Sequence, residues 1–99
     1  MKIDLTKNFI DQKGSLILDG DKPWTLKNVI GQSLLSTFQG DEKLEGQKKY
    51  QLYQLGLKLE KESSVELTAE EIALIKDRIS KGFTVLVMGQ AWDMLEGKL

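Results

Sequence analysis

The sequence predicts an α+β fold that is mostly helical, with a short N-terminal β-ribbon packed on a bundle of three or four helices. Residues 1–24 carry strand and turn patterns, whereas residues 25–99 carry apolar side chains at helical spacing. Thr68, with Glu71 three residues later, forms a capping box that marks a helix start. Ninety-nine residues, 40% of them hydrophobic, are typical of one domain, so residues 1–99 are expected to form a single domain.

The predicted ribbon consists of two strands and two turns. Ile3 and Leu5 alternate with polar residues, which is the pattern of a half-buried strand. Residues 11–14 predict a turn, and residues 16–18 predict a second strand. The Asp19-Gly20 dipeptide that follows predicts a tight turn, after which the chain reverses direction. The side chains expected to pack on the helices are Leu16, Leu18 and Trp24.

The next two elements are expected to be helices. Thr25 can cap the first, whose apolar positions keep helical spacing as far as Phe38. A polar connector over residues 41–47 leads into the second helix, which Ser63-Ser64 ends. The apolar residues of the second helix cover more than one narrow stripe, so we expect it to contact neighbours on two sides. These residues are Tyr50, Leu52, Tyr53, Leu55, Leu57 and Leu59.

A third helix is expected from Ala69 to about Ser80. Leu67 and Ile72 stand at the staple positions on either side of the capping box, and Gly82 is expected to end the helix in the left-handed conformation. The side chains expected to be buried are Ile72, Ile75 and Ile79. The cations expected at the negative end of the helix dipole are Lys76, Arg78 and Lys81.

The last segment has two interpretations. The β-branched run over residues 83–89, between glycines, suits a central strand. A single helix from about Thr84 to Glu96 explains the same run together with the residues that follow, and it is the interpretation we favour, although periodicity alone leaves the strand open. The stripe that would be buried in this helix is Val85, Met88, Trp92 and Leu95.

Composition excludes most catalytic chemistry. The chain has no Cys and no His, so it lacks thiolates, disulfides, and the commonest general base and metal ligand. Its serines lie outside known nucleophile motifs, and its glycines form no phosphate-binding loop. Helix capping explains Glu70 and Glu71, and a hairpin turn explains Asp19 and Asp21 better than a cation site does. We therefore expect no enzyme activity, no catalytic residue, no cofactor and no metal.

Charge bears on the kind of partner, and hydropathy bears on the compartment. The 14 Lys and Arg residues balance 15 Asp and Glu residues, and Arg78 is the only arginine, which disfavours nucleic acid as a partner. Residues 1–6 lack the features of a signal peptide, and no apolar stretch approaches the roughly 20 residues of a membrane span. A cytoplasmic protein without a membrane partner is expected.

Two residue sets are candidate contact surfaces. Apolar side chains that lie off the core stripes of the second and fourth helices predict a protein partner, which could be a second copy of the chain. The residues of this predicted interface are Tyr50, Tyr53, Leu57, Leu86 and Met94, with Leu99 beside them. The region from Lys43 to Lys61 carries lysines with interleaved tyrosines, and this pattern gives an alternative function, a nucleic-acid-binding regulator. Neighbouring glutamates oppose the positive field of these lysines. These lysines are Lys43, Lys48, Lys49, Lys58 and Lys61.

The segments Val65–Lys76 and Val87–Glu96 resemble the ending of small proteins encoded by tailed bacteriophages and prophages. The start of the chain, Lys2–Thr6, followed later by a Gly-Asp turn, is similar in style. The resemblance implies a viral or prophage origin and a bacterial host cytoplasm, and it brings no activity and no functional residue. The function expected from the sequence is a non-enzymatic protein–protein interaction module that acts on a host factor or in particle assembly.

Overall fold

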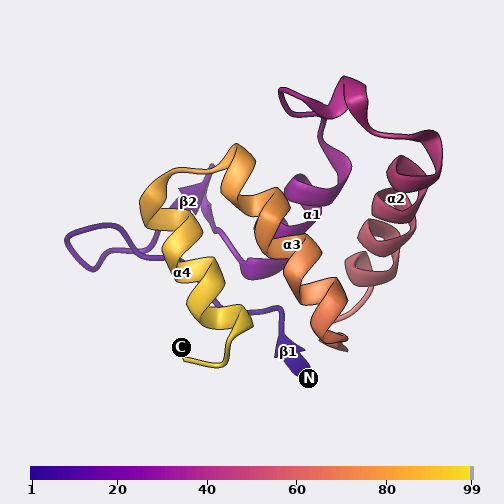
Figure 1. The fold of residues 1–99 in the computed structure, drawn as a ribbon. Coiled ribbons are helices and arrows are strands. Elements are labelled where there is room, and N and C mark those ends of the chain that lie inside the picture. The colour runs from indigo at the N-terminus through magenta and orange to yellow at the C-terminus, as the bar shows by residue number, and fades with distance from the viewer. Residues whose placement is uncertain (99) are drawn as a thin grey trace.

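The computed structural model describes residues 1–98 (Figure 1). Its elements in chain order are β1 (Lys2–Asp4), β2 (Leu18–Asp19), β3 (Lys22–Pro23), α1 (Leu26–Leu35), the short 3-10 helix η1 (Asp41–Lys43), α2 (Gly46–Glu60), β4 (Ser64–Glu66), α3 (Ala69–Gly82) and α4 (Val85–Leu95). The predicted fold class is confirmed, because helices dominate and the strands are short.

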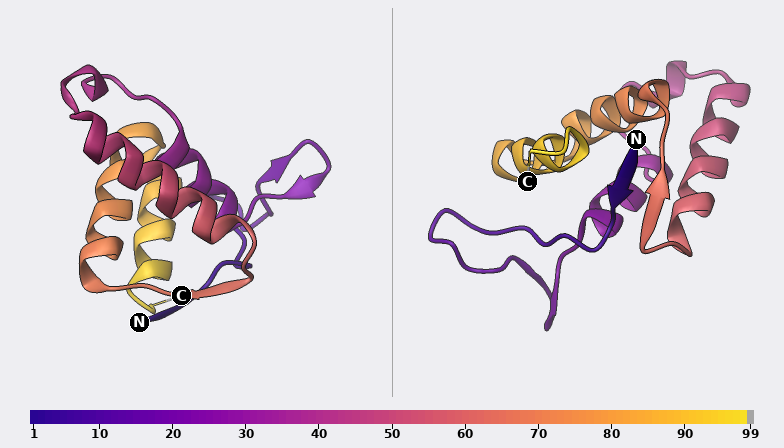
Figure 2. Two further views of the ribbon diagram at one scale, coloured as in Figure 1. Left: turned by 90° about the vertical axis from the view of Figure 1, so that its right-hand side faces the viewer. Right: turned by 90° about the horizontal axis from the view of Figure 1, so that it is seen from below.

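Helix α1 is the centre of the helical part. It contacts α2, α3 and α4, while α4 also packs beside α3 (Figures 1 and 2). Thr25 caps α1 as predicted, and Asn28 completes a capping box by accepting a hydrogen bond from the Thr25 amide at 3.0 Å. The apolar side chains that α1 buries are Leu26, Val29, Ile30 and Leu34.

Two small antiparallel sheets complete the fold. β1 pairs with β4, so that Ile3 lies opposite Val65, and these strands run side by side in the right-hand view of Figure 2. β2 and β3 form a hairpin that turns at Gly20, whose φ of 68° suits a glycine. β4 was not predicted from the sequence, which indicated only a helix break there.

The ribbon packs in the opposite phase to the prediction. Leu16 and Leu18 are exposed, whereas Ile17 packs against the core, so the expectation for these two leucines was wrong. The reason is register: the Ile17 amide donates to the Phe9 carbonyl at 2.9 Å, and successive side chains of a strand point to opposite faces. Trp24 packs on the core as expected.

The third helix has the predicted start but a different end. The Thr68 hydroxyl accepts from the Glu71 amide at 3.1 Å, and the Glu71 carboxylate accepts from the Thr68 amide at 2.9 Å. Gly82 was expected to adopt a positive φ beyond the helix, but it is the last residue of α3 and does not do so. A Cβ on Gly82 would collide with the outer edge of the Phe38 ring, so the close approach of this ring favours glycine at position 82.

The last segment is a helix, so the strand interpretation was wrong. Thr84 caps α4, but Val85 is 82% exposed and the predicted buried stripe is rotated. An uninterrupted apolar run fits several helical phases, so periodicity could not select the buried face. The residues that α4 buries are Val87, Ala91, Met94 and Leu95.

Candidate functional site

Helix α2 has two opposite apolar faces. The inner face packs Leu52, Leu55 and Leu59 into the core, and Gly56 leaves room for the side chain of Leu35 on α1. The outer face carries three large apolar side chains at spacings of three and four residues, which places them on one side of the helix. These residues form the outer stripe: Tyr50, Tyr53 and Leu57, which are 55%, 51% and 43% exposed.

The outer stripe is locally ordered by its own side chains. The rings of Tyr50 and Tyr53 lie 6.1 Å apart at an interplanar angle of 24°, which is a stacked arrangement. Stacking presents a flat aromatic surface beside Leu57 and limits the entropy that the tyrosines can lose on binding. The sequence predicted neighbours on two sides of α2, and within residues 1–98 only the inner side is packed into the core.

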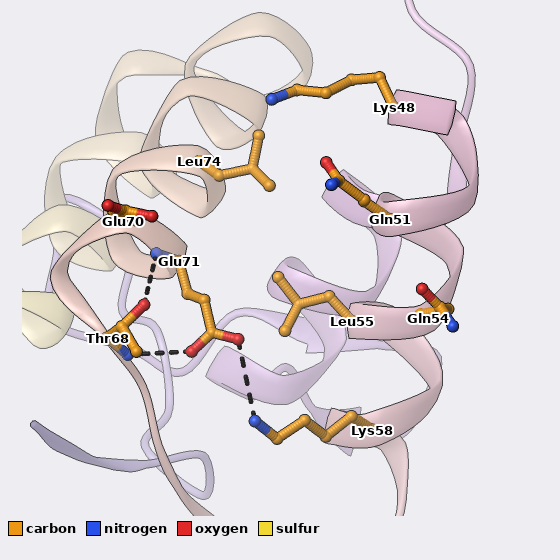
Figure 3. A pocket seen from close by; sticks show the side chains of 9 residues that line it. All are labelled: Lys48, Gln51, Gln54, Leu55, Lys58, Thr68, Glu70, Glu71 and Leu74. Atoms are coloured by element: carbon orange, nitrogen blue, oxygen red, sulfur yellow. Dashed lines mark hydrogen bonds and ion pairs between the residues drawn. The ribbon is translucent and has the colours of Figure 1, made fainter. Parts of the chain in front are cut away.

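A groove of about 420 Å³ lies between α2 and α3. Figure 3 shows Leu55 of α2 and Leu74 of α3 pointing into it from opposite walls. Lys58 spans one end, where its Nζ lies 3.8 Å from Oε2 of Glu71. The other residues that line the groove are Lys48, Gln51, Gln54, Thr68 and Glu70.

Several polar groups of the groove are engaged with one another. The hydroxyl of Thr68 and one carboxylate oxygen of Glu71 are held in the capping box, and Lys58 approaches the other oxygen. Within residues 1–98 no group of three or more Asp and Glu side chains is arranged to hold a metal ion.

The predicted lysines do not form one strip. Lys48 and Lys58 line the α2–α3 groove, whereas Lys49 borders a smaller cavity of about 170 Å³ together with Tyr53 and Leu34 of α1. Lys43 belongs to η1, and Lys61 follows the end of α2. The five lysines are therefore distributed over two sides of α2 and the segments at its two ends.

The structure divides the remaining residues of the predicted interface. Leu86 is exposed on α4, and α3 lies between α4 and α2, so Leu86 does not join the outer stripe (Figure 1). Met94 was predicted at the interface but is buried in the core, because it lies on the α4 face that carries Ala91 and Leu95. Leu99 lies outside the described residues.

The strongest polar feature, a buried ion pair, was not predicted. Arg78 and Asp41 are 2% and 5% exposed, and the guanidinium donates to both carboxylate oxygens, at 2.7 and 3.0 Å. It also donates to the carbonyls of Ser33 and Ser36 at the end of α1, at 3.0 and 2.8 Å. Hydrogen bonds from Arg78, followed by the amide of Phe38, lower the pKa of Asp41 to about 2.

The ion pair holds in place the segment that leads to α2. Arg78 joins α3 to the end of α1 and to η1, which immediately precedes α2. The sequence contained one signal for it, because position 78 lies beside Ile79 and three residues after Ile75, on the buried face of the helix. Its partner 37 residues away carried no comparable signal.

No protein-family model, curated protein or solved structure matches the chain with significant similarity. Within residues 1–98 no helix is long and apolar enough to cross a membrane. The outer stripe and the adjoining groove are therefore interpreted from their own chemistry.

Proposed function

We propose that the chain is a non-enzymatic interaction module that binds a partner protein through the outer stripe of α2. The observation that carries the proposal is the exposure of Tyr50, Tyr53 and Leu57 on one side of a helix whose other side is packed. Exposed apolar clusters of this kind are typical of protein contact sites, and tyrosine is enriched among the residues that dominate binding energy.

The setting is proposed from the resemblance of the C-terminal third to small phage and prophage proteins. A protein of this origin would work in the bacterial host cytoplasm, on a host factor or during particle assembly. The balanced charge and the absence of His and Cys support a role based on occupying a surface.

A nucleic-acid-binding regulator is the second candidate. The stacked pair of Tyr50 and Tyr53 beside several lysines favours it, because bases stack on aromatic side chains and lysines contact phosphates. Its test is a mobility shift on mixed-sequence DNA and RNA, which must weaken steeply with salt if phosphates are contacted.

A comparative capture experiment tests the proposed function. Wild-type protein, Tyr53→Glu and Leu18→Glu are immobilised and exposed to the same bacterial lysate, and bound proteins are quantified by mass spectrometry. Leu18 is a matched control, because it is 54% exposed and lies on the hairpin away from α2. We expect one protein to be captured by the wild type and the control and to fall about tenfold or more with Tyr53→Glu.

Identical capture by all three proteins would contradict the proposal, as would capture that only Leu18→Glu abolishes. Circular dichroism of each variant checks that the fold is retained. Sedimentation over a hundredfold concentration range shows whether the partner is a second copy of the chain.

A further inference from the structure

Helix α2 and the residue that follows it are the basic part of a slightly acidic chain. Residues 46–61 contain four lysines and a single acidic residue, Glu60, for a net charge of +3, while the whole chain has a net charge of −1. An exposed surface of this kind favours a partner of opposite charge, since complementary potentials speed encounter and suppress wrong partners.

The outer stripe has the spacing of a helix–helix seam. Tyr50, Tyr53 and Leu57 correspond to successive a, d and a positions of a heptad. The flanking e and g positions hold Lys49, Gln54, Gly56 and Lys61, which include two cations and no acid. The next d position is Glu60, beside Lys61 at the end of the helix. A partner helix lying on this seam would therefore meet a lysine on each edge and one acid at that end.

We infer that the partner presents an acidic amphipathic helix that packs along the outer stripe of α2, with carboxylates directed at Lys49 and Lys61. The inference rests on the proposed function and names the chemistry of its partner. Tyr50, Tyr53 and Leu57 bury the apolar face of the incoming helix, and the lysines on the two edges select its charge.

A second copy fits the outer stripe less well. Two α2 helices packed stripe to stripe bring together two segments that each carry a net charge of +3. Like charges facing each other across such a seam are destabilising. A nucleic acid is also anionic, but Lys48 and Lys49 line cavities on different sides of α2.

Two synthetic three-heptad peptides test the inference with the full chain. Both carry leucine at a and d, while one carries glutamate and the other lysine at every e and g position. We expect the glutamate peptide to bind about tenfold more tightly than the lysine peptide, because several weak ion pairs act together. This binding should weaken with added salt and be lost in Tyr53→Glu.

A charge exchange gives the sharpest result. Lys49→Glu combined with Lys61→Glu should reverse the preference, so that the lysine peptide binds more tightly. The matched control is Lys13→Glu combined with Lys22→Glu, which makes the same charge change on exposed hairpin and turn residues away from α2 and should keep the wild-type preference.

Each other outcome overturns the inference. Failure of the glutamate peptide to bind, equal binding of both peptides, or an unchanged preference after the charge exchange would show that charge at this stripe does not select the partner. If lysate capture still depends on Tyr53, the proposed function stands and only this inference fails. A concentration-dependent dimer that Tyr53→Glu splits, or nucleic-acid binding lost in the charge-exchange variant, would identify a different occupant.

Discussion

At the scale of single residues, the Arg78–Asp41 pair shows how one side chain fixes several segments. The planar guanidinium satisfies two carbonyls at the end of α1 as well as the carboxylate of Asp41, and it lies 4.7 Å from the centre of the Phe38 ring. Sequence reasoning treated Arg78 as a charge at a helix end, because its position was visible but the distant carbonyls and carboxylate were not.

Replacing Arg78 should destabilise the fold strongly. We expect Arg78→Met to lower the free energy of unfolding by about 3–5 kcal/mol, since it removes one partner of a buried ion pair. Lys81→Met on the same helix is the control, because Lys81 is 43% exposed and forms an i,i+4 bridge with Asp77 at the surface; it should change stability by about 0.5 kcal/mol or less. Urea denaturation measures both, and equal effects would contradict the structural role given to Arg78.

The ion pair also predicts a direction of pH dependence. The pKa of Asp41 is lowered from 3.8 to about 2 in the folded chain, so the unfolded chain binds a proton more readily. The stabilisation from the carboxylate is therefore complete above about pH 4 and is lost as the pH falls through about 2. In urea melts, the destabilisation caused by Asp41→Asn should shrink as the pH falls over this range. A penalty that stays constant would contradict the assignment.

At the scale of elements, local signals predicted the helices and long-range packing decided their faces. Thr68 and Glu71 are three residues apart, so their capping box could be recognised directly from the sequence, and the same is true of the Thr25 cap. The buried face of α4 could not be recognised, because the run from Val85 to Met88 is apolar throughout. The outer stripe was predicted from Tyr50, Tyr53 and Leu57, but its exposure depended on which other elements cover α2.

Two helical glycines should respond in opposite directions to alanine. A Cβ at Gly82 would collide with the Phe38 ring, which also contacts Arg78, so Gly82→Ala should cost about 1–3 kcal/mol. Gly89 lies inside α4 with nothing within 4 Å of a Cβ, so Gly89→Ala should stabilise the fold by about 0.5–1 kcal/mol. Thermal melts compare the variants, and a neutral or stabilising effect of Gly82→Ala would mean that α3 does not approach Phe38 this closely.

At the scale of the whole molecule, the N-terminal segment contributes to the core of the helical part. Ile3, Leu5 and Phe9 are fully buried with the helix side chains, and β1 pairs with β4, about sixty residues away along the chain. This pairing could not be predicted, because β4 is only three residues long and strand pairing over such a distance leaves no local pattern. The division into a β-ribbon over residues 1–24 and a helical part over residues 25–99 therefore matches the sequence patterns, but the two parts share one core.

This packing predicts that the N-terminal segment and the helices unfold in one transition. Trp24 reports on the junction, because its ring lies 6.1 Å from that of Phe9 and 5.7 Å from that of Phe83, which follows α3. In a Trp92→Phe background, the urea midpoint of Trp24 fluorescence should equal that of the far-UV circular dichroism of the helices, as two-state unfolding requires.

Ile3→Ala provides the second half of this test. Ile3 is buried on β1, so its truncation should cost about 2–5 kcal/mol and move both midpoints together to lower urea. Leu18→Ala is the control, because Leu18 is exposed on the hairpin and its truncation should leave both midpoints nearly unchanged. If Ile3→Ala moved the Trp24 transition and left the helical one in place, residues 1–24 would be a separate cooperative unit, and the single domain expected for residues 1–99 would be wrong.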